Sequence, residues 1–235
     1  GKHSDDRSDD RTAAGGRPEF AHVLAGRQQR AEGDGLGVDH GMLFAHEIGE
    51  DLGDAEQTHL SLGVRTPGRH WDHRWALSVL NSALGGGLSS RLFQQIREER
   101  GLAYSVGTFL APLEHSAYIM ASVATANENL AEAIDIMRTE IEQVVKYGIT
   151  AEELEKAKTY SIGAFALRLD RNARIASMLA GMQLSGLGPS YLDERSGLID
   201  SVTQDDIRRV ARRMFLGDEN ADPDTTPIEL ITAIV

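Results

Sequence analysis

The sequence predicts an α+β fold, in which an antiparallel sheet carries helices packed on one face. The main reason is the order of the periodic segments, which run as one strand, two helices, two strands and then a series of helices. The regular alternation of strands and crossover helices that a doubly wound fold requires is absent. The chain has 235 residues, of which 41% are hydrophobic and 26% charged, as in an ordinary globular protein.

The first half of the predicted domain contains three strands. Leu60, Leu62 and Val64 alternate with polar or small residues, a pattern typical of a half-buried strand, which Pro67 then interrupts. Two helices with terminal glycines follow, and then two strands that form a hairpin around Pro112. The expected helices span about 75–84 and 89–100, and the expected hairpin strands span about 103–110 and 117–124.

The second half is predicted to be mostly helical. Apolar residues at helical spacing from Leu130 to Val145 indicate a long amphipathic helix that ends at Gly148. Thr150-x-x-Glu153 and Thr203-x-x-Asp206 are patterns typical of capped helix starts. The remaining helices are expected at about 150–169, 172–185, 191–199 and from 203 onward, and the apolar run 228–235 is compatible with a short strand.

Three regions differ in composition. Residues 1–54 are rich in Gly, Arg, Asp and His, and we expect them to form a poorly ordered segment because they offer little apolar surface to bury. Residues 55–216 form the predicted α+β domain. Residues 217–235 form a tail that ends in the possible strand.

The charge balance disfavours some partners. The formal net charge is −12, so nucleic-acid binding is not expected. The densest basic stretch, from Arg208 to Arg213, is interpreted as the solvent face of a helix. No apolar run approaches the roughly 18 residues that cross a bilayer, so no membrane span is expected, and nothing indicates a particular compartment. The chain has no cysteine, so disulfides and thiolate ligands are excluded.

Several motifs between residues 56 and 106 occur together. They are Leu80-Asn81-Ser82-Ala83-Leu84-Gly85-Gly86-Gly87, Ser89-Ser90-Arg91-Leu92-Phe93 and Ile96-Arg97-Glu98-Glu99-Arg100-Gly101-Leu102-Ala103-Tyr104-Ser105. The combination closely resembles the C-terminal half of the pitrilysin and mitochondrial-processing-peptidase family of inverted zincins. The similarity continues through Gly148-Ile149-Thr150, Ala157-Lys158 and the helix after Val202, and so covers about residues 55–215.

The resemblance implies a division of labour between two homologous halves around a peptide chamber. One half carries the zinc motif His-x-x-Glu-His, and the other contributes an Arg and a Tyr to the substrate. The residues that match these two are Arg97 and Tyr104. The resemblance also implies that Gly85, Gly86 and Gly87 form a loop near the substrate, although a helix-ending turn explains them equally well. In some bacterial members the two halves are separate chains.

The chemistry of Arg97 and Tyr104 fits that role. When a peptide carbonyl is attacked by water, negative charge develops on its oxygen, to which a phenol hydroxyl can donate a hydrogen bond. A guanidinium can hold a neighbouring carbonyl. From residue types alone, the alternative is a Tyr104 packed in the core and an Arg97 that is simply a surface charge.

A zinc site is not found in the sequence. No two of the eight histidines are four apart, so neither His-x-x-Glu-His nor His-Glu-x-x-His can be written. The nearest approach is His46-Glu47-x-x-Glu50, which has one imidazole where two are needed, and the pair His70 and His73 is interpreted as a helix-start cluster. We therefore expect no cofactor in this chain, and zinc in a partner chain or in an upstream half.

The leading hypothesis is a substrate-binding, non-zinc half of a zinc metalloendopeptidase that does not cleave peptides alone. Its partners would be a zinc-bearing homologous half and a peptide substrate. Two alternatives are a non-catalytic structural subunit of a larger assembly, such as the core subunits of respiratory complexes, and an inert truncated fragment.

Overall fold

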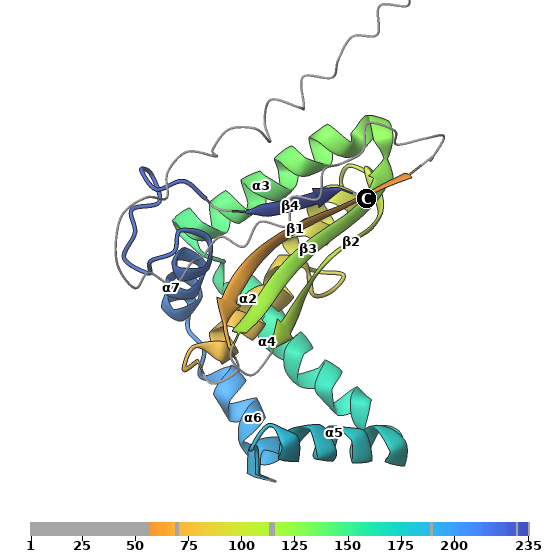
Figure 1. Cartoon of the computed structure of the whole chain (residues 1–235), viewed down its shortest axis with the longest axis vertical. Helices are drawn as coiled ribbons and strands as arrows, with labels where there is room; N and C mark the ends of the chain where they lie inside the picture. Colours follow the sequence, from red (N-terminus) through yellow and green to blue (C-terminus); the bar gives the residue numbers. More distant parts are fainter. Residues whose placement is uncertain (1–56, 69–70, 113–115, 189, 229, 235) are drawn as a thin grey trace, which may run out of the picture. The chain divides into compact units, whose positions relative to one another are not determined.

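The computed structural model describes residues 57–68, 71–112, 116–188, 190–228 and 230–234 (Figure 1). The predicted poorly ordered segment 1–54 lies outside these residues. The strands are β1 (Gln57–Pro67), β2 (Ala103–Pro112), β3 (Ser116–Ala126) and β4 (Ile231–Ile234). The α-helices are α2 (Arg74–Gly85), α3 (Leu130–Tyr147), α4 (Ala151–Ala166), α5 (Asn172–Leu184), α6 (Ser190–Asp200) and α7 (Gln204–Phe215). Three short helical segments are the π-helix η1 (Phe93–Glu98) and the 3₁₀ helices η2 (Asn127–Asn129) and η3 (Leu167–Leu169).

The four described strands form one antiparallel sheet in the order β2-β3-β1-β4. The successive strands β2 and β3 pair as predicted, and β1 lies between β3 and β4. The C-terminal apolar run contains a strand, because Leu60 of β1 pairs with Ile234 of β4. The predicted α+β class is confirmed.

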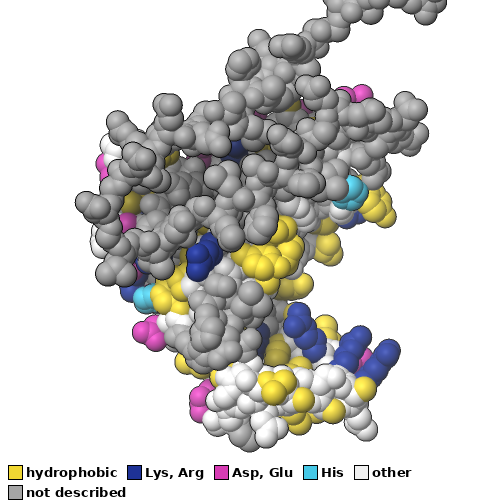
Figure 2. Space-filling view, in the orientation of Figure 1, with side chains coloured by type: hydrophobic (Ala, Val, Ile, Leu, Met, Phe, Trp, Pro, Cys, Tyr) yellow, Lys and Arg dark blue, Asp and Glu magenta, His cyan; other side chains and the backbone are white. Residues whose placement is uncertain are grey.

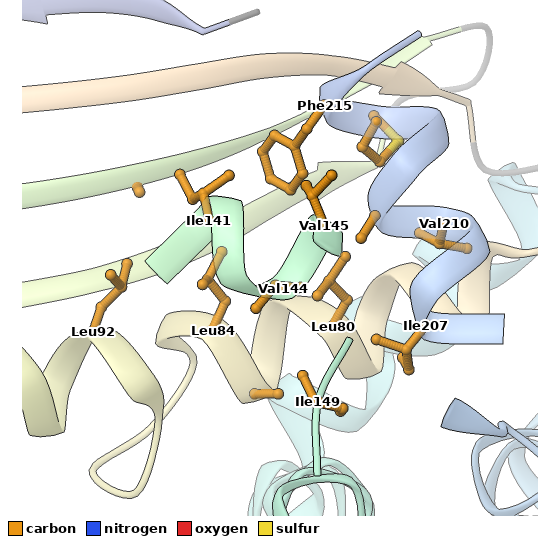
Figure 3. Packing of buried hydrophobic residues seen from close by; sticks show 14 of the residues in the cluster. Leu80, Leu84, Leu92, Ile141, Val144, Val145, Ile149, Ile207, Val210 and Phe215 are labelled. Atoms are coloured by element: carbon orange, nitrogen blue, oxygen red, sulfur yellow. The ribbon is translucent and has the colours of Figure 1, made fainter. Parts of the chain in front are cut away.

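One face of the sheet is buried under helices. Leu60 and Leu62 of β1 and Val123 of β3 are at most 2% exposed, whereas His59 and Tyr118 on the opposite face are exposed. The buried side chains form one cluster with residues of α2, α3 and α7. Figure 3 shows this packing, with side chains of all three helices converging on the sheet. The labelled residues are Leu80, Leu84, Leu92, Ile141, Val144, Val145, Ile149, Ile207, Val210 and Phe215.

Both predicted capping boxes are present and begin α4 and α7. At the first, the Glu153 amide donates to the Thr150 hydroxyl at 3.2 Å, and the Thr150 amide donates to the Glu153 carboxylate at 2.7 Å. The Lys158 ammonium, only 8% exposed, donates to the carbonyl of Asp200 at 2.9 Å. Since Asp200 ends α6, this bond also places a positive charge at the negative end of that helix dipole.

Two large side chains of α6 pack against α2 and α4. The Arg195 guanidinium lies 4.2 Å from the Phe165 ring centroid and 5.8 Å from that of Trp75. Tyr191 stacks on Trp75 at 5.7 Å.

No described helix is long and apolar enough to cross a membrane.

The glycines after α2 are explained in part by close packing. A Cβ at Gly85 would lie 2.6 Å from the backbone nitrogen of Thr108 in β2. The same threonine donates its side-chain hydroxyl to the backbone carbonyl of Asn81 at 2.9 Å, so β2 and α2 are also linked by a hydrogen bond here. Glycine at position 85 therefore allows the helix to approach the edge strand.

Replacing this glycine should destabilise the protein. For Gly85→Ala we expect the free energy of unfolding to fall by about 1–3 kcal/mol, because the added methyl has to displace backbone atoms. The matched control is Gly163→Ala in α4, where nothing lies within 4 Å of the new Cβ, and alanine should add up to about 1 kcal/mol of stability. Urea unfolding of both variants measures this, and equal effects at the two positions would contradict the packing argument.

Candidate functional site

The segment from η1 to β2 departs from the regular structure that the sequence predicts. A continuous α-helix is expected over 89–100, but Phe93–Glu98 is π-helical, with the Glu99 amide donating to the Gln94 carbonyl at 2.9 Å. The inner side of this turn is fixed by Phe93 and Ile96, which are 9% and 0% exposed. A π-helix widens the turn and is often found at functional sites. Arg97 lies on its outer side, with its side chain 41% exposed.

Gly101 reverses the chain between the π-helix and the strand. Its φ of 63° is the left-handed conformation that favours glycine. The Gly101 amide donates to the carbonyl of Arg97 at 3.1 Å, and the Leu102 amide donates to that of Ile96 at 2.9 Å. These two bonds close the helix end, so the backbone of Arg97 is held within the turn itself.

Tyr104 lies at a β-bulge in the edge strand. Ala103 pairs with Thr125 and Ser105 pairs with Ala124, so Tyr104 has no partner on β3. A bulge disrupts the alternation of side chains and can redirect one of them. Tyr104 is 77% exposed and the following Ser105 is exposed as well, so the alternation of buried and exposed side chains is interrupted here. The alternative that Tyr104 packs in the core is therefore wrong.

The two irregularities bring Arg97 and Tyr104 together. The guanidinium carbon of Arg97 lies 5.6 Å from the centroid of the Tyr104 ring and 5.0 Å from that of Phe93. Both distances are within the range of cation–π attraction. Within the described part of the chain, the nearest carboxylate to the guanidinium is Glu98, at 4.0 Å. We call this exposed pair of Arg97 and Tyr104 the rim.

Hydrogen bonds to the Leu102 carbonyl hold the turn on β3. Thr125, which is 2% exposed, donates its hydroxyl at 2.6 Å, and Asn129 donates its amide at 3.4 Å. Releasing this partly buried carbonyl would cost free energy, because its hydrogen bonds to the two side chains would be lost. These hydrogen bonds consequently hold the backbone between Arg97 and Tyr104 in place.

Arg91 holds the start of the same segment. Its guanidinium makes a bidentate contact with Glu153 at 2.5 and 2.9 Å, and lies 3.6 Å from Glu140. Burial opposes ionisation of Glu153, but the hydrogen bonds from Arg91 and Thr150 outweigh it and lower its pKa. Burial raises the pKa of Glu140 despite Arg91 nearby. Arg91 belongs to one of the sequence motifs, but no sequence pattern assigns it a role, because its carboxylate partners are 49 or more residues away, with 62 separating it from Glu153.

The three glycines predicted to bind substrate lie at the end of α2 and in the turn after it, and Gly85 is buried. The atoms nearest to a Cβ at Gly85, Gly86 or Gly87 belong to Thr108, Ser82, Asn81 and Tyr160, not to the rim. Thr108 is four residues along β2 from Tyr104, or about 13 Å. Packing accounts for Gly85 and Gly86, and the assignment of the three glycines to substrate binding stays a prediction.

The described residues do not fit a zinc ion. Among them, no three His, Asp or Glu side chains lie close enough together to hold a metal. His59 and His73 belong to the described part, whereas the predicted near-motif at His46-Glu47 and the residue His70 lie outside it. The rim therefore offers hydrogen-bond donors without metal ligands, and it can bind carbonyl oxygens or carboxylates.

Comparison with known proteins gives a consistent result. A family model described as the peptidase M16 inactive domain matches residues 44–161, half of the chain. A Mycobacterium tuberculosis protein named as an uncharacterized zinc protease is 43% identical over 162 residues. This stretch is 69% of the chain but 37% of the relative, so the chain spans well under half of that relative's length.

Solved structures show the same fold. The peptidase M16 inactive domain from Pseudomonas fluorescens matches with a TM-score of 0.65 and 24% identity, covering 77% of this chain and 40% of that one. A chain of Complex III2 from Candida albicans matches with a TM-score of 0.62 and 14% identity, over 77% of this chain and 43% of that one.

The Arg91–Glu153 contact gives a stability prediction with a definite sign in pH. Because the pKa of Glu153 is lowered in the folded state, its contribution is present above its unfolded pKa and is lost as pH falls through its folded pKa. Glu153→Gln should therefore lower the free energy of unfolding by about 1–3 kcal/mol at pH 7, and the difference from wild type should shrink in acid.

The matched control is Glu152→Gln, since Glu152 is fully exposed and pairs with Lys156 on the helix surface. Its effect at pH 7 should be much smaller. Denaturant unfolding of both variants from pH 7 to pH 3 measures this. A Glu153→Gln effect that grows on acidification would contradict the assignment.

Proposed function

The chain belongs to the peptidase M16 family, as its inactive domain, and on this premise we propose that it is the substrate-binding, zinc-free half of a zinc metalloendopeptidase. The observation that carries the proposal is the rim. Arg97 and Tyr104 are polar, exposed and within 5.6 Å of one another, and a π-helix, a left-handed glycine and a β-bulge hold them there.

In this proposal Tyr104 stabilises charge on the substrate. Its hydroxyl donates a hydrogen bond to the carbonyl oxygen of the peptide bond that is attacked, and the bond strengthens as negative charge develops on that oxygen. The neighbouring Arg97 guanidinium donates to a second carbonyl of the same peptide. The Arg97 guanidinium lies against the rings of Phe93 and Tyr104. This supports the proposal, because a guanidinium that is already held in place loses less conformational freedom when it binds the peptide.

Zinc and the activation of water are assigned to a partner. The described residues fit no metal, and the relatives named as zinc proteases are much longer than the stretch that matches. The partner we propose is the zinc-bearing homologous half, either as a separate chain or as another part of the same protein. The complex would then act on peptides, while this chain alone would not.

The test of the rim uses Tyr104→Phe in the complex with the zinc-bearing partner recovered from the native source. Loss of an oxyanion donor should lower kcat by about 10- to 1,000-fold. The matched control is Tyr147→Phe on α3, which removes a hydroxyl from another exposed tyrosine and should leave kcat unchanged. Peptide hydrolysis at saturating substrate measures both.

Arg97→Lys separates binding from chemistry. Lysine keeps the charge but loses the planar donor pair, so KM should rise more than kcat falls. If Tyr104→Phe and Arg97→Lys both retained the kinetic constants of the wild-type complex, the rim would have no role in the reaction.

A further inference from the structure

An eighteen-residue segment of the described chain is strongly exposed although it is apolar. It consists of η3 and α5, residues 167–184, and we call it the arm. The arm contains four of the ten exposed large hydrophobic residues of the described chain. They are Leu167 at 76%, Leu169 at 39%, Leu179 at 44% and Leu184 at 91% exposed.

The helix of the arm has little packing of its own. Within α5 only Met182 is buried, and the helix packs chiefly on the preceding η3. Figure 1 shows α5 beyond the ends of α4 and α6, with no strand beside it. Eight of its thirteen residues are Ala, Ile, Met or Leu, and Arg174 is its only charge. A helix that is apolar on all sides is normally buried.

Physical chemistry requires something to cover such a helix. Isolated helices shorter than about 12–15 residues are marginal in water, and most helical stability in proteins comes from tertiary packing. Leucines at 76% and 91% exposure leave most of their apolar surface in water, at a cost of roughly 25 cal/mol per Å². The arm therefore has the features of a helix at a protein–protein interface rather than those of a helix exposed to solvent.

The charges of the arm restrict what can cover it. The arm itself contains three arginines, Arg168, Arg171 and Arg174, and a single acidic residue, Asp170. Asp170 pairs with Arg174 at 3.2 Å and with Arg171 at 3.6 Å. Three positive charges minus one negative charge leave two uncompensated positive charges, on a chain whose formal net charge is −12. Figure 2 shows Lys or Arg side chains gathered beside the hydrophobic side chains at one end of this region.

A second copy of the chain is a poor occupant. In a two-fold dimer through the arm, both copies would bring the same uncompensated positive charge to the shared interface, which is less favourable than an acidic partner. Arm-to-acidic-face contacts between copies would be head-to-tail and would produce rings or open chains rather than a simple pair. The complementary surface is an apolar groove with an acidic border on a different polypeptide or domain.

We propose that the arm docks into such a groove on the zinc-bearing half, and so joins the two halves of the peptidase. The identity of the partner rests on the proposed function, and the surface that binds it rests on the exposure and charge of the arm. The length of the relatives supports this choice, because the aligned stretch is only 37% of the mycobacterial protein and most of its length is available as a partner.

The test is hydrogen exchange on the full chain, free and in the complex recovered from the native source by a tag on this chain. The complex is identified by bound zinc and peptide hydrolysis, not by the mere presence of another protein. In the free chain, amides of residues 172–184 should exchange quickly, and in the zinc-containing complex they should be protected at least about tenfold.

The variant Leu184→Asp tests the same interface by measuring association with the zinc-bearing partner. It should weaken association at least about tenfold, because a carboxylate replaces an apolar anchor. Because Leu184 is 91% exposed, thermal unfolding of the free chain should not change. The control Tyr147→Asp places the same charge at another exposed residue, on α3, and should leave association unchanged. Arg168→Glu should also weaken association, most strongly at low salt.

The outcomes separate this inference from the proposed function. A zinc-containing complex in which the arm stays unprotected, or which Leu184→Asp leaves intact, overturns the arm interface and leaves the rim proposal standing. If no zinc-containing complex exists, both are overturned. Protection of the arm together with normal peptide hydrolysis rates in Tyr104→Phe supports the interface and rejects the role of the rim.

Discussion

The apolar face of the sheet has to be removed from water, and the rest of the described structure is arranged around this requirement. Leu60, Leu62 and Val123 project from one face and meet α2, α3 and α7 in one cluster. A shift of one residue in the pairing of β1 and β3 would turn these side chains to solvent, so the register is strongly specified. Gly85 then allows α2 to approach β2, which fixes where the segment between them begins.

The rim is formed where this regular arrangement is interrupted. The buried Phe93 and Ile96 require one side of η1 to face the core, and the bulge between Ala103 and Ser105 shifts the pairing of β2 with β3 by one residue. Between these anchors the chain reverses at Gly101 and leaves Arg97 and Tyr104 exposed side by side. The same devices that keep the core packed therefore present two polar side chains to a ligand.

Sequence patterns predict local features well and long-range ones poorly. The two capping boxes and the alternation in β1 depend on residues close in sequence, and both are confirmed. The π-helix and the bulge depend on packing against β3 and the core, so a helical period over 89–100 cannot reveal them. The contact of Arg91 with Glu153 likewise has no local pattern.

The candidate site shows the same division. The resemblance to a family indicates Arg97 and Tyr104, whereas residue types alone favour a buried tyrosine and an ordinary surface charge. The helix α5 was expected from its composition, but its exposure depends on which elements lie beside it. The pattern of apolar residues in a helix predicts that the helix packs against something. It does not show whether the packing partner is part of the same chain or of another one.

The central claim is that this domain supplies substrate contacts to a peptidase without supplying the metal chemistry. It is tested most directly by measuring peptide hydrolysis with this chain alone, with its zinc-bearing partner alone, and with both together in the presence of excess zinc. The account predicts hydrolysis in the mixture and essentially none with this chain alone. Hydrolysis by this chain alone, or a partner that is equally active without it, would contradict the account.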